Sequence, residues 1–109
     1  MNVLQLRARR GATWAEFNAT DFEQRRLFFA SANTSIKQLS WALAKEVRKK
    51  GAVSLHAYSD NLKAVNIAVK ALATVPKLTG GERVMCIPSH GWAQQAGMES
   101  IDTQGEKPR

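Results

Sequence analysis

Apolar side chains recur at helical spacing in two stretches of the chain. In the first stretch the intervals are three or four residues, which places these side chains along one side of a helix. They are Ile36, Leu39, Leu43 and Val47. Ser35 and Gln38 have the spacing of a capping box at the start, and Gly51 offers a left-handed stop at the end. The pattern predicts a helix over residues 35–50.

The second stretch follows Ser59 and Asp60, either of which can cap a helix. Its apolar stripe consists of Leu62, Val65, Val69 and Leu72. Because proline lacks a backbone N–H and clashes with the preceding turn, Pro76 predicts the end of this helix.

Three runs of mainly apolar residues flank these helices and predict strands. They cover residues 27–31, 53–58 and 83–87. In the middle run Val53, Leu55 and Ala57 alternate onto one face, and Pro88 is expected to stop the last run. The order β-α-β-α-β over residues 27–88 predicts an α/β fold in which helices cover a sheet.

The two ends of the chain carry weaker patterns. Residues 2–9 alternate between apolar and polar, which is compatible with an edge strand. Residues 13–26 contain three bulky aromatic side chains and indicate a short helix that packs on the domain. The glycines and glutamines of residues 89–99 predict a hairpin loop, and residues 98–103 are compatible with a short final strand.

The chain has a formal charge of +7, from 16 Lys and Arg against 9 Asp and Glu. Residues 35–83 hold nine of the basic and three of the acidic side chains, so the excess lies mainly there. A face of Lys and Arg attracts polyanions because it releases the counterions condensed on phosphates. Many basic proteins are merely soluble, however, so charge alone leaves both interpretations open.

Other compositional features limit the class of protein. A single cysteine, Cys86, excludes an internal disulfide and fits a reducing compartment. No apolar run approaches the roughly 20 residues that a membrane span needs, so we expect a cytoplasmic protein without a membrane partner. A domain of 109 residues is marginally stable alone, which favours a homodimer.

Basic residues on the two predicted helices are the candidate nucleic-acid contacts. On or beside the first helix they are Lys37, Arg48, Lys49 and Lys50. Along the second helix Lys63, Lys70 and Lys77 recur every seven residues, with Asn66 between them. Seven residues nearly complete two helical turns, so these lysines form a row on one face. The alternative is a solvated helix face without a ligand.

Trp41 lies away from the apolar stripe of the first helix and should not face the core. An exposed tryptophan usually marks an interface. Dimer packing is the first interpretation, and base stacking, contact with another protein and burial beneath the N-terminal residues are the alternatives.

The remaining candidate chemistry is sparse. His90 and Trp92 combine a ring with hydrogen-bonding groups in the predicted loop and are compatible with base or groove contacts. His56 should face the side of its strand opposite the inward residues, without a second ligand at metal spacing, and Cys86 should be a buried packing residue. Because no catalytic arrangement or cofactor motif is present, we expect neither an enzyme nor a cofactor or metal site.

Several segments, in the right order, resemble the stage V sporulation protein S family, whose members share the Alba-like fold. The resemblance covers about residues 27–90. It rests on Ser31-Ala32, on residues 42–44 and 47–52, on LKAVNIAVK at 62–70 and on Cys86-Ile87-Pro88.

The resemblance implies a dimeric, two-layer βαβαββ domain over residues 27–104 that binds nucleic acid. Residues 1–26 then form an N-terminal extension and residues 105–109 a frayed tail. The binding elements implied are a basic loop at Ser31–Lys37, where Asn33 and Thr34 replace the expected lysine, and a hairpin at Ser89–Gly97. The alternation of residues 2–9 could supply a strand that the polar C-terminal segment lacks.

Two functional hypotheses follow. The first is a nucleic-acid-binding module that contacts phosphates of DNA or RNA, with a regulatory role, as in sporulation, compatible with the resemblance. The second is a regulatory protein-interaction module that docks through Trp41.

Overall fold

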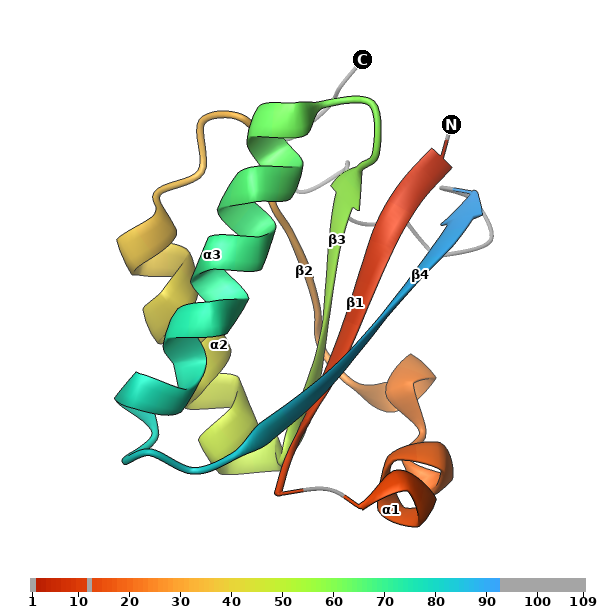
Figure 1. The fold of residues 1–109 in the computed structure, drawn as a ribbon, viewed down its shortest axis with the longest axis vertical. Coiled ribbons are helices and arrows are strands. Elements are labelled where there is room, and N and C mark those ends of the chain that lie inside the picture. The colour runs from red at the N-terminus through yellow and green to blue at the C-terminus, as the bar shows by residue number, and fades with distance from the viewer. Residues whose placement is uncertain (1, 12, 93–109) are drawn as a thin grey trace.

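The computed structural model describes residues 2–11 and 13–92, which form an α/β domain with a four-stranded mixed sheet and three α-helices (Figure 1). A short 3-10 helix, η1, joins α1 to β2. The elements in chain order are β1 (Asn2–Arg10), α1 (Trp14–Ala19), η1 (Phe22–Gln24), β2 (Leu27–Phe29), α2 (Ile36–Lys50), β3 (Ala52–Tyr58), α3 (Leu62–Leu78) and β4 (Val84–Trp92).

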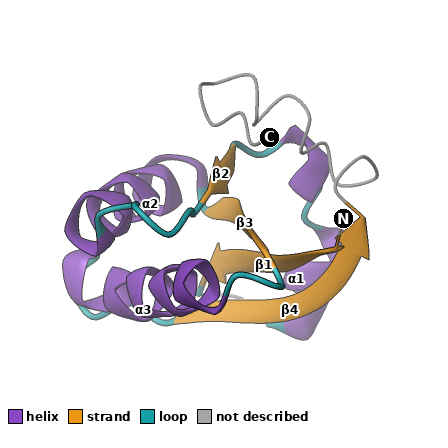
Figure 2. Cartoon of the chain, turned by 90° about the horizontal axis from the view of Figure 1, so that it is seen from above, coloured by secondary structure: helices purple, strands orange, loops and turns teal. Residues whose placement is uncertain are grey.

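The strands lie in the order β2-β3-β1-β4, with β1 antiparallel to both neighbours and β2 parallel to β3. Seen from above, α2 and α3 lie side by side in one layer on the same side of the sheet (Figure 2). The main core lies between this layer and the sheet and includes Leu43, Val47, Leu55 and Ala68. The outer surfaces of the two helices therefore belong to one side of the molecule.

The prediction of an edge strand over residues 2–9 is wrong in its position, because β1 lies inside the sheet between β3 and β4. The alternating side chains of β1 are compatible with this interior position. Leu6 and Ala8 face the helix layer and join the main core, whereas Val3 packs on the opposite face with Leu27 and other partly buried side chains. A strand that packs apolar side chains on both faces is more typical of the interior of a sheet than of its edge.

The first predicted helix is confirmed as α2. The Ser35 hydroxyl accepts a hydrogen bond from the Gln38 N–H at 3.2 Å, which satisfies one free donor of the first turn. Gly51 ends the helix at φ 84°, a left-handed conformation that side chains disfavour. Arg48, Lys49 and Lys50 occupy the last turn, where positive charge is favourable to the helix dipole.

The second predicted helix is confirmed as α3, but both of its ends differ from the prediction. Asn61, rather than Ser59 or Asp60, is the N-cap, and its Oδ1 accepts from the Ala64 N–H at 3.1 Å. The helix passes Pro76 and ends at Leu78. Proline is tolerated so close to the end because it disturbs only the final turn.

The last predicted strand is longer than expected, since β4 continues through Pro88 to Trp92. Among the described strands β4 lies at the edge of the sheet, where one side is unpaired and proline is tolerated. Residues 89–92 are therefore strand rather than loop. The rest of the predicted hairpin, the final strand at 98–103 and the tail at 105–109 lie outside the described residues.

The short helix expected within residues 13–26 is confirmed as α1. Thr13 and Glu16 form a complete capping box, in which each side chain bonds the backbone N–H of the other residue. The pKa of the Glu16 carboxyl is lowered, mainly by this hydrogen bond to the Thr13 backbone. The Phe17 side chain is buried, stacks on Trp14 and contacts Phe22, which anchors α1 and η1 to each other.

Candidate nucleic-acid interface

The outward side of α2 carries a stripe of basic side chains around one tryptophan. Its members are Lys37, Trp41, Lys45 and Arg48, all exposed. They follow one another at intervals of four, four and three residues, so they lie on one side of the helix. At about 100° per residue this side is roughly opposite Leu39 and Leu43, which are buried against the sheet.

The predicted lysine row of α3 is exposed along its whole length. Lys63, Lys70 and Lys77 are all at the surface, and Asn66 is exposed between them. Val69 and Pro76, in contrast, line a hollow between α3 and β4. The row lies about 110° around the helix from that apolar side, so it is turned away from β4. The row and the α2 stripe thus share the outer side of one layer.

We call these side chains together the helix-layer surface. It consists of Lys37, Trp41, Lys45, Arg48, Lys63, Asn66, Lys70 and Lys77. The helices α2 and α3 hold eight basic residues and a single acidic one, Glu46, for a charge of +7. This equals the charge of the whole chain, so the remaining residues are neutral in sum. Helix charge, rather than general basicity, accounts for the positive excess.

No cation of the helix-layer surface is paired with an acid among residues 2–11 and 13–92. The two ion pairs found there involve Arg9 with Glu16 at 3.8 Å and Arg10 with Glu82 at 3.9 Å. Neither acid belongs to α2 or α3. The ammonium and guanidinium groups of the helix layer are therefore open to an external anion.

A polar hollow of about 500 Å³ extends the positive region at the C-terminal end of α2. Its lining is Glu23, Gln24, Arg25, Arg26, Glu46, Lys49 and Lys50. The buried Nε–H of Arg25 has no hydrogen-bond acceptor in the described part of the chain, so this donor is not used by the fold. Lys49 and Lys50 thus face two arginines from the segment before β2.

Sequence reasoning missed three basic residues of this region, namely Lys45, Arg25 and Arg26. Lys45 follows Trp41 by four residues, and this helical spacing was a usable signal. Arg25 and Arg26 come near Lys49 only through the fold, because α2 returns the chain to the segment before β2. No pattern within a short stretch of sequence predicts that contact.

The other predicted contact residues are not brought to the helix-layer surface. Asn33 is exposed in the turn before α2, where its N–H donates to the Ser31 hydroxyl. His90 is exposed on β4, and Trp92 is the last residue of that strand. The side of α3 that faces β4 is apolar, and the lysine row lies on another side of that helix. The structure therefore separates a helix group from a β4 group.

His56 faces the side of β3 opposite the helices, as expected from the alternation of its strand, and it is buried. Desolvation, together with a smaller contribution from the positive charge of Arg7, lowers its pKa from 6.5 to about 4. A neutral, enclosed imidazole of this kind belongs to the packing of that face rather than to a ligand surface.

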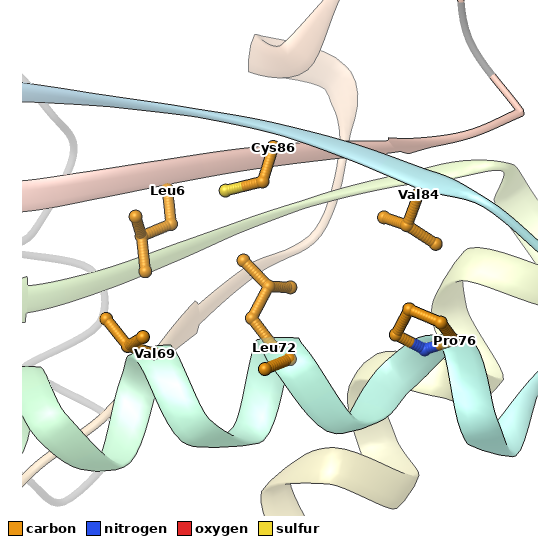
Figure 3. A pocket seen from close by; sticks show the side chains of 7 residues that line it. Leu6, Val69, Leu72, Pro76, Val84 and Cys86 are labelled. Atoms are coloured by element: carbon orange, nitrogen blue, oxygen red, sulfur yellow. The ribbon is translucent and has the colours of Figure 1, made fainter.

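The prediction that Cys86 is buried is wrong. Its strand lies at the edge of the sheet, so the residue is exposed, while its thiol points into the hollow between β4 and α3 (Figure 3). This hollow measures about 260 Å³, and Leu6, Leu72 and Val84 are among its apolar lining. Desolvation there raises the pKa of the thiol.

No three His, Cys, Asp or Glu side chains within 2–11 and 13–92 are grouped so that they could hold a metal ion. None of the helices described is long and apolar enough to cross a bilayer.

In comparisons with known proteins, the chain matches no family model, no curated protein and no solved structure.

Proposed function

We propose that this protein binds nucleic acid through the helix-layer surface, mainly by contacts with phosphates. The observation that carries the proposal is the charge of +7 on α2 and α3, whose cations have no acidic partner among the described residues. Free cations on one side of a domain suit a polyanion, because each contact with a phosphate releases condensed counterions. Such contacts fix position without reading sequence, so DNA and RNA are both candidate ligands.

The resemblance to the stage V sporulation protein S family supports the same function. The order β-α-β-α-β from β2 to β4 agrees with the part of an Alba-like domain expected over residues 27–88. We propose that β1 supplies the further strand that an Alba-like sheet takes from its C-terminal end. Deletion of residues 2–10 is then expected to abolish cooperative thermal unfolding, and an unchanged melting temperature would contradict this role.

The rest of the proposal follows from the same resemblance and from the composition. The protein acts in the cytoplasm as a regulatory, homodimeric binding module, and its action requires neither a catalytic group nor a cofactor. The polar hollow beside Lys49 and Lys50 provides a further place for a phosphate at the end of α2.

The test is a titration of the purified chain with a fluorescent oligonucleotide at a series of salt concentrations. We expect binding at about 50 mM salt and a steep linear loss of log affinity with log salt concentration. Substitution Lys70→Gln should reduce that slope by about 0.7 to 0.9 for one lost phosphate contact. Absence of binding to any DNA or RNA at about 50 mM salt would contradict the proposed function.

Arg83→Gln is the matched control for Lys70→Gln. Arg83 is also exposed and carries the same charge, but it lies before β4 and outside the helix layer. Its backbone carbonyl, which accepts from the Gly11 N–H, is kept in the variant. The control should retain the wild-type slope, and an equal loss in both variants would show that only total charge matters.

A second candidate function is docking on another protein through Trp41, which is 50% exposed. The surrounding cations would require an acidic partner surface. In that case Trp41→Ala should abolish capture of the partner and leave salt-dependent binding to nucleic acid unchanged.

A further inference from the structure

Trp41 lies in the middle of the basic stripe of α2 and not at its margin. Half of its surface is exposed, although a side chain of this size usually buries most of its area. Lys37 and Lys45 stand four residues before and after it, and Arg48 stands seven residues after it. On a helix these offsets bring all three cations to the same side as the indole.

Within the described residues, the Trp41 indole does not pack on other aromatic rings or in an apolar cluster. Trp14, Phe17 and Phe22 contact one another, and Phe29 packs on Tyr58, whereas the Trp41 ring stacks on no described aromatic ring. It is likewise absent from both apolar clusters. An aromatic face beside cations is therefore presented to an external ligand.

A second copy of the chain is a poor occupant of this site. A two-fold interface places the same patch against itself, so the basic cluster of Lys37, Lys45 and Arg48 in one protomer would face the same basic cluster of the other. Like charges brought together in this way oppose association. A polyanion with flat apolar faces fits both properties of the site, because its phosphates meet the cations while a base covers the ring.

We propose that Trp41 is a stacking platform for an unpaired base, and hence that the ligand class of the helix-layer surface is single-stranded nucleic acid. In a duplex the faces of the bases are covered by their neighbours, so a flat ring on a helix surface cannot stack on them without unstacking the helix. In a single strand every base offers a free face, and cations on either side hold the backbone. This inference rests on the proposed function and specifies its ligand.

The experiment compares three oligonucleotides of equal length, namely a single strand, the corresponding duplex and a single strand of abasic sites. Affinities are measured at one low salt concentration for the wild type, Trp41→Ala, Trp41→Phe and Trp14→Ala. Trp14 is the matched control, because it is 59% exposed but lies on α1, outside the helix layer. Circular dichroism and melting curves establish that each variant is folded.

We expect Trp41→Ala to weaken binding of the normal single strand about tenfold. Binding of the duplex and of the abasic strand should change less than about twofold, since their phosphate contacts remain. Trp41→Phe should recover part of the loss because a ring is restored, and Trp14→Ala should behave as wild type.

Three outcomes would overturn the inference. In the first, the wild type binds, but Trp41→Ala weakens binding of the single strand and of the duplex to the same extent, or weakens binding of neither. In both cases Trp41 is not a stacking platform, although the proposed function stands. If light scattering shows that Trp41→Ala dissociates an oligomer, the ring belongs to a contact between copies. If the wild type binds none of the three oligonucleotides, the proposed function itself fails.

Discussion

The two sides of the sheet use positive charge in opposite ways. On the side away from the helix layer, arginines have partners within the molecule, as Arg7 lies over the Phe22 ring at 5.8 Å and Arg9 pairs with Glu16. On the helix side, Lys63 and Lys70 have none among the described residues. The first group packs the fold, and the second is left for a ligand. A count of basic residues in the sequence cannot separate these two uses.

The largest effect should come from the packed side. Phe17→Ala removes the buried ring that links Trp14 to Phe22, and burial of a phenylalanine of this kind is worth about 3 to 5 kcal/mol of unfolding free energy. Denaturant titration measures this loss, and Trp14→Ala, at an exposed position, should cost far less. Equal costs in the two variants would show that α1 is not anchored as described.

A pH titration should affect the stability of the packed side next. The folded pKa of His56 is about 4, below the ordinary value of 6.5, so the unfolded chain takes up the proton first as the pH falls. The contribution of His56 to the free energy of unfolding is fully present above about pH 6.5 and is lost as the pH falls toward 4. Below about pH 4 there is no further loss from this group. The full effect is roughly 3 kcal/mol.

The matching variant for this titration is His56→Gln, which has no titrating side chain in the same place. The unfolding free energies of wild type and variant, measured from pH 7.5 to pH 4, should converge as the pH falls. Parallel curves would contradict the burial of a neutral imidazole.

Loss of charge from the open side should leave stability nearly unchanged. The triple variant Lys63→Gln, Lys70→Gln, Lys77→Gln removes no ion pair between described residues, so its unfolding free energy should change by less than about 0.5 kcal/mol. Binding of nucleic acid at about 50 mM salt should weaken by on the order of a hundredfold. A stable variant with unchanged affinity would place the ligand elsewhere.

Much of the fold was predictable, because local signals agree with it. The apolar stripes and the caps Ser35 and Gly51 predicted α2, and the lysine spacing on α3 predicted a single exposed row. The place of β1 was not predictable, because alternation indicates a strand but not its neighbours in the sheet. For the same reason Cys86 was expected to be buried, although its strand lies at an edge.

The candidate site was predictable to a similar degree. Residues on one helix, such as Lys37 and Arg48, follow from helical periodicity alone. The approach of Arg25 and Arg26 to Lys49 depends on where distant segments meet, and the separation of His90 from the lysine row depends on the order of the strands. Neither relation leaves a signal within a short window of sequence.

The most direct measurement is an NMR titration of the isotope-labelled protein with a single-stranded oligonucleotide. Backbone and side-chain shifts should change along the outward sides of α2 and α3, with the indole N–H of Trp41 among the largest changes, while signals of α1 and η1 stay in place. Shifts concentrated on α1 and η1, or spread evenly over both sides of the sheet, would contradict the assignment of ligand binding to the helix layer.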